Sequence, residues 1–189
     1  MDITYTIEFF SYWHCGSGLS AGADVDSLVI KDAKGMPFVP GKTIKGLIRE
    51  AAETLTCLAP DEYPSQKIID NIFGKRSETA EIPQIGKAFF SNAELPATDY
   101  DAIINANAQN YLFEAVASTA IGDNGIAINH SLRKTQVTLP CTLEGHILNI
   151  PDEDDKTKKL FEDSLAFIKR LGENRNRGLG RCKFTIKSI

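Results

Sequence analysis

Hydrophobic and polar positions follow regular spacings in six stretches of the chain, and these spacings predict the elements of a core. Four stretches are rich in β-branched and aromatic residues, as strands are: residues 3–13, 86–95, 137–150 and 182–189. Two others, residues 43–58 and 154–171, repeat apolar residues every three or four positions, which predicts helices with one apolar face. The predicted order is strand, helix, strand, strand, helix, strand. We therefore expect an α+β fold with a ferredoxin-like or RRM-type core.

The stretch between the second and third predicted strands is too long for a plain connection. Such long segments tend to be functional or to fold into something of their own. The spacing of apolar residues over 101–120 favours a helix, and residues 27–32 predict a short strand. Residues 59–85, with three prolines, are expected to be mostly loop. We predict a single RRM-like domain over residues 1–189 with an insertion at about 96–135.

Composition indicates the kind of protein and raises one objection to binding of nucleic acid. The 189 residues are 42% hydrophobic and hold no apolar run of membrane-spanning length, and no basic segment precedes the apolar start, so we expect a cytoplasmic protein. None of the four cysteines forms a Cys-x-x-Cys pair, which fits reduced thiols. The net charge of −4 argues against nucleic acid. Basic residues nevertheless gather in 31–49 and 169–183, and the local field of a face matters more than the total.

The segment KGMPFVPGKTIKG (34–46) contains Gly41-Lys42-Thr43, which raises the possibility of a nucleotide-phosphate loop. That loop requires a glycine at position 36, where this chain has Met36. It also aims backbone N–H groups at phosphate oxygens, and the two prolines of the segment have none to offer. A nucleotide-binding domain using Gly41-Lys42-Thr43 is thus the least favoured of the functions we consider.

A different anion site fits the same segment better. Lys42, Lys45 and Arg49 share one side of the predicted helix 43–58, opposite its apolar face. A helix N-terminus carries free N–H groups and the positive end of the helix dipole. This end of the helix is therefore predicted to bind phosphate, and a phosphodiester suits it as well as a nucleotide.

Residues 172–181, GENRNRGLGR, form a second basic segment. Arg175 and Arg177 supply forked donors that match phosphate geometry, while Gly178 and Gly180 allow the backbone to approach a ligand or turn sharply. Solvated arginines after a helix end are the alternative. Because the arginines alternate with glycines, we favour phosphate contact.

The loop HCGSGLSAGADVD (14–26) joins glycines to carboxylates. Gly16 and Gly18 can lie against an RNA backbone, or simply make a flexible connection. Asp24 and Asp26, with Asp32 just beyond, are candidate Mg²⁺ ligands, because that ion prefers oxygen donors. Taken alone, aspartates in such a loop are more often turn formers.

His14 is the residue of this loop that titrates near neutral pH, so it is a candidate general base or acid. Its position at a strand end beside glycines predicts an accessible side chain. A lone histidine is more often a packing or hydrogen-bonding residue, and no nucleophile or second histidine stands at a telling spacing from it.

Several of these stretches together resemble one known family. KGMPFVPGKTIKGLIRE resembles the signature of the RAMP superfamily of CRISPR proteins, NIFGK followed by GKAFFSNAEL is similar to its Phe-Gly segment and next strand, and ENRNRGLGR to its C-terminal glycine-rich loop. VDSLVIKD leading into the first motif is most similar to the backbone subunit of type III effector complexes. In two places the chain departs from the family: Leu28 replaces the usual proline and Glu173 a common glycine.

The resemblance implies a guide-RNA-binding subunit that polymerises along the guide (CRISPR) RNA, contacts other effector subunits and pairs the guide with target RNA. The insertion becomes a thumb that kinks the RNA, with Arg133 and Lys134 near its base. His14 and the glycines after it line the same RNA channel as Lys42, Lys45 and Arg49. By resemblance, Asp26 matches the loop aspartate that cleaves target RNA with a divalent metal, Mg²⁺ being the candidate.

A second enzyme reading stays open at this point. The chain can instead be a metal-independent endoribonuclease that processes precursor CRISPR RNA, with His14 as its general base. The two enzyme readings differ in their metal requirement and in the residue on which cleavage depends.

Overall fold

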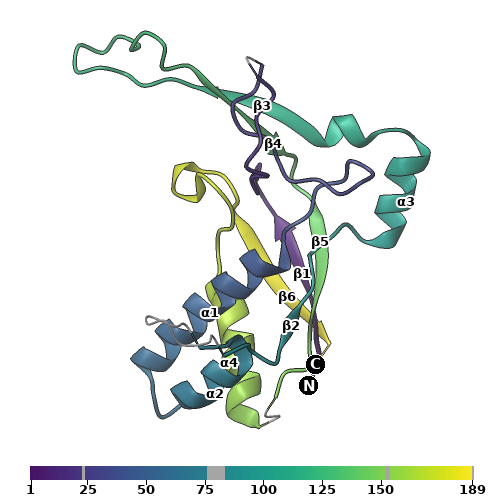
Figure 1. Cartoon of the computed structure of the whole chain (residues 1–189), viewed down its shortest axis with the longest axis vertical. Helices are drawn as coiled ribbons and strands as arrows, with labels where there is room; N and C mark the ends of the chain where they lie inside the picture. Colours follow the sequence, from purple (N-terminus) through teal and green to yellow (C-terminus); the bar gives the residue numbers. More distant parts are fainter. Residues whose placement is uncertain (23, 76–83, 152–153, 189) are drawn as a thin grey trace.

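The computed structural model describes residues 1–22, 24–75, 84–151 and 154–188, and its centre is a four-stranded antiparallel sheet in the order β2-β5-β1-β6. The strands are β1 (Ile3–Phe9), β2 (Phe89–Phe90), β5 (Thr142–Leu148) and β6 (Cys182–Ser188). Helices α1 (Gly41–Leu58) and α4 (Asp155–Phe167) pack on one face of the sheet (Figure 1). Element order and strand order are those of a ferredoxin-like fold, which confirms the predicted core.

The two faces of the sheet follow from the alternation in β1. Ile3, Tyr5 and Ile7 are fully buried against the helices, whereas the intervening Thr4 and Thr6 point to the open face. Tyr5 pairs with Gly145 of β5, and a Cβ at Gly145 would overlap the tyrosine hydroxyl. Only glycine therefore leaves room for this ring in the core.

The helices bury the faces that the apolar spacing predicts. In α1, Ile44 and Ile48 are fully buried. In α4, Leu160 and Phe161 are buried, and Asp154 caps the helix by accepting the Thr157 N–H at 2.8 Å.

Two local predictions are wrong and a third is incomplete. Residues 113–118 form strand β3 rather than the end of a helix, because they pair with β4 (Arg133–Thr138) along their whole length. Residues 27–32 make only isolated bridges rather than a strand. The described part of 59–85 is loop except for α2 (Gln66–Phe73), a helix that the prediction missed and whose Ile69, Ile72 and Phe73 are buried. In the predicted strand region 137–150, β5 begins at Thr142, just after Pro140.

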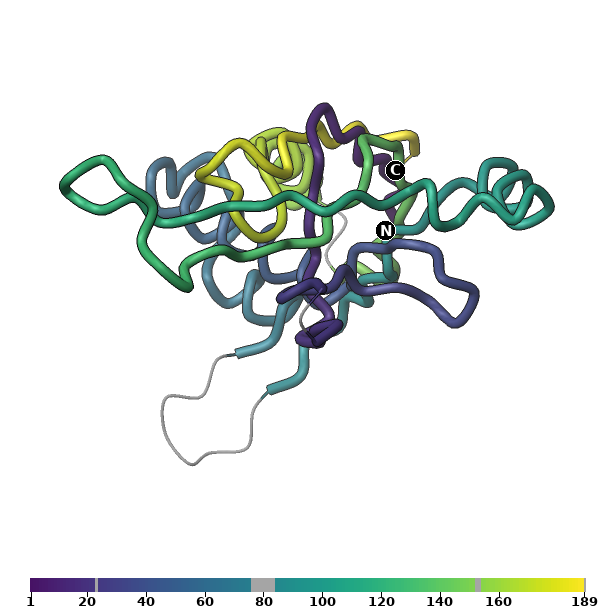
Figure 2. Tube along the Cα trace, turned by 90° about the horizontal axis from the view of Figure 1, so that it is seen from above, coloured from purple at the N-terminus to yellow at the C-terminus, as the bar shows by residue number. Residues whose placement is uncertain are grey.

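The insertion between β2 and β5 contains α3 (Ala97–Asn105), the 3₁₀ turn η1 (Gln109–Leu112), β3 (Phe113–Ser118) and β4 (Arg133–Thr138). Strands β3 and β4 form a separate two-stranded sheet that projects from the core, while α3 lies on the opposite side (Figures 1 and 2). We call β3, β4 and the loop joining them the thumb hairpin. None of the described helices combines the length and apolar character needed to cross a bilayer.

Contacts from the segment between β1 and α1 join this insertion to the core. Trp13 exchanges two backbone hydrogen bonds with Thr138 of β4. The Asp32 carboxylate accepts the Tyr100 hydroxyl of α3 at 2.7 Å, and the Lys31 ammonium lies 3.7 Å from the centre of the Phe113 ring. The chain just after β1 therefore anchors the insertion.

Candidate nucleic-acid interface

The loop after β1 is an ordered hairpin. Gly16 bridges Val29, and the N–H groups of Ser17 and Leu28 donate to the carbonyls of Leu28 and Leu19 at 2.9 and 3.0 Å. Gly18 is exposed and has a positive φ of 78°, which glycine adopts without strain. The hairpin thus carries its glycines on the surface and leads directly to Asp26.

Asp26 lies at the base of the thumb hairpin. Its Oδ2 accepts the Lys134 N–H at 2.7 Å, and its own N–H donates to the Lys134 carbonyl at 2.9 Å. The residue is exposed, and its other carboxylate oxygen has no partner among the described residues. One carboxylate oxygen is therefore held in place while the other is available to a ligand.

The described residues supply only part of a Mg²⁺ site. Among them no three Asp, Glu, His or Cys side chains gather as a metal cluster. Asp32 accepts N–H groups from Lys34 and Met36 as well as the Tyr100 hydroxyl, so its carboxylate is occupied. Mg²⁺ often binds through one or two carboxylates, waters and substrate phosphates, and Asp26 can supply the carboxylate of such a set.

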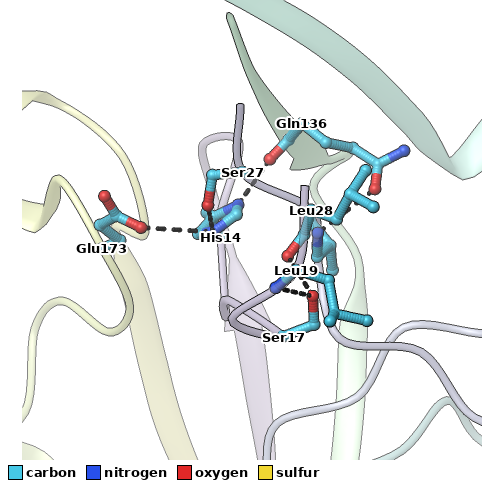
Figure 3. Close-up of polar contacts among 8 residues, drawn as sticks. His14, Ser17, Leu19, Ser27, Leu28, Gln136 and Glu173 are labelled. Atoms are coloured by element: carbon cyan, nitrogen blue, oxygen red, sulfur yellow. Dashed lines mark hydrogen bonds and ion pairs between the residues drawn. The ribbon is translucent and has the colours of Figure 1, made fainter. Parts of the chain in front are cut away.

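His14 lies where three segments meet (Figure 3). Its Nδ1 is 2.6 Å from the Gln136 carbonyl of β4, and its Nε2 is 3.1 Å from Ser27 Oγ and 3.3 Å from Glu173 Oε2. Because a carbonyl only accepts, Nδ1 carries a proton, and in the neutral ring the Ser27 hydroxyl donates to Nε2.

The prediction that His14 is accessible is wrong. The side chain is 0% exposed, because the residues it binds cover both edges of the ring. Direct RNA contact and general base chemistry both require an exposed nitrogen, so this geometry favours neither role for His14.

The glycine-rich loop packs against the same segment. The Gly180 N–H donates to the Tyr12 carbonyl at 2.7 Å, and the Glu173 N–H donates to the His14 carbonyl at 2.9 Å. A Cβ at Gly172 would overlap that His14 carbonyl. The loop therefore docks through its backbone, which leaves side chains near its tip free for other contacts.

The two arginines of this loop lie differently. Arg177 and Gly178 are exposed, and Gly178 has a positive φ of 95°. Arg175 is half-buried in a cleft between the end of α4 and the Leu47, Glu50 and Thr54 side of α1. Arg177 is thus the more available of the two to a phosphate.

Lys42 and Lys45 line a different cleft. It is bounded by residues 85–90, and Lys87 brings a third cation to it. Successive helix residues are about 100° apart, so Lys42 and Lys45 lie on the opposite flank of α1 from Glu50 and Thr54. The lysines and Arg175 therefore do not share one groove, contrary to the single channel expected from the sequence.

Two further sequence expectations fail at α1. Arg49 is paired with the protein's own acids: its Nε lies 2.6 Å from Glu53 Oε1 and Nη2 3.8 Å from Asp70 Oδ1, with 11% of the side chain exposed. It is not free for phosphate. The predicted phosphate site at the helix N-terminus also loses a donor, because the N–H of buried Gly41 donates to Asn92 Oδ1 at 3.0 Å.

Sequence reasoning missed three residues of this region. Ser27 and Gln136 hold His14, and Lys87 joins the lysine cleft. Ser27 and Gln136 are ordinary polar residues with no motif around them. Lys87 stands in the segment GKAFF, but nothing in its spacing relates it to a helix forty residues earlier.

Comparison with known proteins identifies one family and one shared fold. The model of the RAMP superfamily matches residues 6–183. The fold is similar to a chain of the type III-B Cmr-beta complex bound to cognate target RNA, with TM-score 0.69, 12% identity and coverage of 98% of this chain and 97% of that chain. A chain of the same complex in its apo state gives TM-score 0.68, 12% identity and coverage of 100% and 98%.

No curated protein matches the sequence. The family match spans the elements that matter here, from β1 through the Asp26 loop and α1 to the glycine-rich loop and β6. On that match over nearly its full length, the chain belongs to the RAMP superfamily.

Proposed function

We propose that this protein is a guide-RNA-binding backbone subunit of a type III-like CRISPR ribonucleoprotein, and that Asp26 cleaves the paired target RNA with a divalent metal. Its partners are then the guide RNA, the target RNA, other effector subunits and further copies of itself along the RNA. Such a complex works in the cytoplasm.

The observation that carries the proposal is the meeting of three segments at His14. The Asp26 loop, the base of the thumb hairpin and the glycine-rich loop all contact this one residue. The family match covers all three, and the chain of similar fold belongs to a type III-B Cmr-beta complex that is bound to target RNA. A phosphodiester chain passing this junction would meet Arg177, Arg133 and Lys134 beside an exposed carboxylate.

Electrostatics supports RNA binding at separate places despite the acidic total. Lys42, Lys45 and Lys87 have no ion pair with a described acid and gather in one cleft. Arg133 and Arg177 are exposed and likewise unpaired within the described residues. Because these groups contact phosphates rather than bases, binding should depend little on sequence and strongly on salt.

Mg²⁺ would act on the bound RNA by polarising a phosphoryl oxygen or activating water. In this chain Asp26 would supply a carboxylate oxygen, and the Lys134 N–H fixes the other oxygen. The phosphates of the RNA would complete the coordination, so the site forms only with RNA present. The burial of His14 supports this reading over metal-free cleavage by that histidine.

Binding is tested with labelled single-stranded RNA over a range of salt concentrations. Replacing Lys42, Lys45 and Lys87 together by alanine should weaken binding and reduce the salt slope by about 0.7 for each phosphate that the protein no longer neutralises. Lys158→Ala on the exposed side of α4 is the matched control and should leave the slope unchanged. An unchanged slope in the triple variant would remove the lysine cleft from the RNA path.

Cleavage is tested on target RNA paired to a guide in the assembled ribonucleoprotein. We expect cutting with Mg²⁺, none with EDTA, and loss in Asp26→Ala, while Asp101→Ala, at an exposed aspartate of α3, retains it. Metal-free cutting of precursor RNA that is lost in a His14 variant would instead favour the processing enzyme.

A further inference from the structure

We propose that His14 is a positioning residue, which holds the Asp26 carboxylate in its working place and couples it to the glycine-rich loop. For the role of Asp26, this inference rests on the proposed function. It replaces the direct RNA contact expected of His14 with an action through two neighbouring residues.

His14, Ser27 and Gln136 form a closed ring of hydrogen bonds. His14 Nδ1–H donates to the Gln136 carbonyl at 2.6 Å, the Gln136 N–H donates to the Ser27 carbonyl at 2.9 Å, and Ser27 Oγ lies 3.1 Å from His14 Nε2. The Gln136 side chain adds a fourth bond, since its Oε1 accepts the Val29 N–H at 3.3 Å. The ring fixes the loop against β4 because each member is held from two sides.

Asp26 is attached to this ring at both of its anchor points. It directly precedes Ser27 in the loop, and the Lys134 N–H that holds its carboxylate lies two residues before Gln136 in β4. A movement of the loop that carries Asp26 relative to β4 would break the bond between Lys134 and Asp26. The His14 imidazole contacts both the loop and β4, and so sets the distance that this bond requires.

The Nε2 edge of the His14 imidazole also faces the glycine-rich loop. Glu173 Oε2 lies 3.3 Å from His14 Nε2, its N–H donates to the His14 carbonyl, and its side chain is 56% exposed. A neutral Nε2 accepts from Ser27, so the carboxylate pairs with it only when the ring carries a second proton, whereas the backbone hydrogen bond holds the loop in either form. The glycine-rich loop, which carries Arg177 four residues after Glu173, is therefore linked through His14 to the loop that carries Asp26.

Histidine suits this place because its two nitrogens face opposite neighbours in a fully buried position. Phenylalanine fills a similar volume with neither polar atom. Asparagine places a donor near the position of Nδ1 and can serve Gln136, whereas glutamine reaches the position of Nε2 and can serve Ser27. Comparing phenylalanine, asparagine and glutamine in place of His14 therefore separates the effect of each hydrogen bond from the effect of packing.

The first experiment uses the protein alone and measures hydrogen exchange at the Lys134 amide. His14→Phe should speed this exchange about tenfold or more, with the amides of β1 and β5 unchanged, because only the local contact opens. Asp26→Ala should give the same rise, and His14→Asn should restore part of the protection. His146→Phe, at the half-exposed histidine of β5, is the matched control and should change nothing at Lys134.

The second experiment measures target-RNA cleavage in the assembled complex. His14→Phe should slow cutting at saturating target by about tenfold to a hundredfold, because small displacements of a catalytic group have effects of that size, while RNA affinity changes far less. If the His14→Phe protein does not fold, Ser27→Ala and Glu173→Gln report on the same bonds from their other ends.

The outcomes separate the two proposals. Unchanged exchange at Lys134 in His14→Phe, or equal acceleration at β1 and β5, overturns the positioning role whatever the RNA results are. If exchange rises as expected but Asp26→Ala still cleaves target RNA, the positioning of Asp26 stands and its assignment as the cleaving residue fails.

Discussion

The four-stranded core and the thumb hairpin use their side chains in opposite ways. In the core, β1 alternates strictly between buried and more exposed residues, and its inward side chains are close to 0% exposed. In the hairpin, no residue of β3 is buried, and Ile121, Ile126 and Leu132 are 60%, 66% and 61% exposed. The core is therefore specified by packing within the chain, whereas the hairpin is held by backbone pairing and presents its side chains outward.

This difference shows which side chains of the fold are available to bind a ligand. Side chains that pack the core cannot also meet a ligand, whereas most side chains of the hairpin can, because among its described residues only Val137 and Thr138, at the base of β4, are buried. Asp26 and His14 lie at the junction, where one is exposed and the other fully buried. The comparison predicts that a substitution costs more stability at a buried core position than at an exposed position of the insertion.

The largest effect is expected for Trp13→Ala, in the core at the foot of the hairpin. The indole is fully buried, stacks on Phe9 at 4.6 Å between ring centres, and donates from Nε1 to the Leu139 carbonyl at 3.1 Å. Removing a buried aromatic ring costs about 3 to 5 kcal/mol. Urea unfolding of the two proteins measures this difference.

Tyr111→Ala supplies the control for that experiment. Tyr111 is 80% exposed in η1, so its loss should change the free energy of unfolding by less than about 0.5 kcal/mol. Similar losses at Trp13 and Tyr111 would show that the insertion is packed as tightly as the core, and would end the comparison.

The sequence predicts the core better than the insertion, because the core elements have a local signal in the sequence and strand β3 does not. In α4, Leu160, Phe161 and Leu165 are all buried as their spacing predicts, because local periodicity and tertiary packing agree there. In β3, the alanines of FEAVAS favour a helix locally, and the strand forms because β4 pairs with it from residues far along the chain. That pairing has no signal within the segment itself.

The candidate site divides in a similar way. The motifs single out Asp26, Lys42 and the glycine-rich loop as candidates, and the family match covers all three. They do not show that Arg49 faces Glu53 and Asp70, or that His14 is buried, since both facts depend on partners distant in sequence or unmarked by any motif. Three-dimensional neighbours decide whether a polar side chain is available.

A middle-sized effect is expected for Asp32→Ala, at the joint between the two regions. Burial raises the pKa of this carboxyl, but hydrogen bonds from Tyr100, Met36 and Lys34 outweigh it and hold the pKa below its ordinary value. Losing these bonds should cost about 2 kcal/mol at neutral pH. Urea unfolding measures it, with the exposed Asp24→Ala as the matched control.

The Asp32 contribution should also depend on pH in one direction. Because the folded state lowers the pKa, the carboxylate stabilises the protein above the ordinary aspartate pKa of about 3.9, and this gain is lost as the pH falls through the lower folded value. The difference between wild type and Asp32→Ala should therefore be constant from neutral pH downward and shrink only below about pH 4. A difference that grows on acidification would mean that Asp32 does not anchor α3 through its charged form.

The smallest effect is expected for Ile126→Ser, in the loop of the thumb hairpin. The side chain is 66% exposed, so the free energy of unfolding should change by less than about 0.5 kcal/mol. The same substitution at fully buried Ile147 of β5 should cost several times more, since it leaves a cavity and a buried hydroxyl.

If Ile126→Ser is nevertheless destabilising, the hairpin must be covered in solution. A wild-type unfolding midpoint that rises with protein concentration would then identify the cover as a second copy of the chain, because association stabilises a fold by mass action.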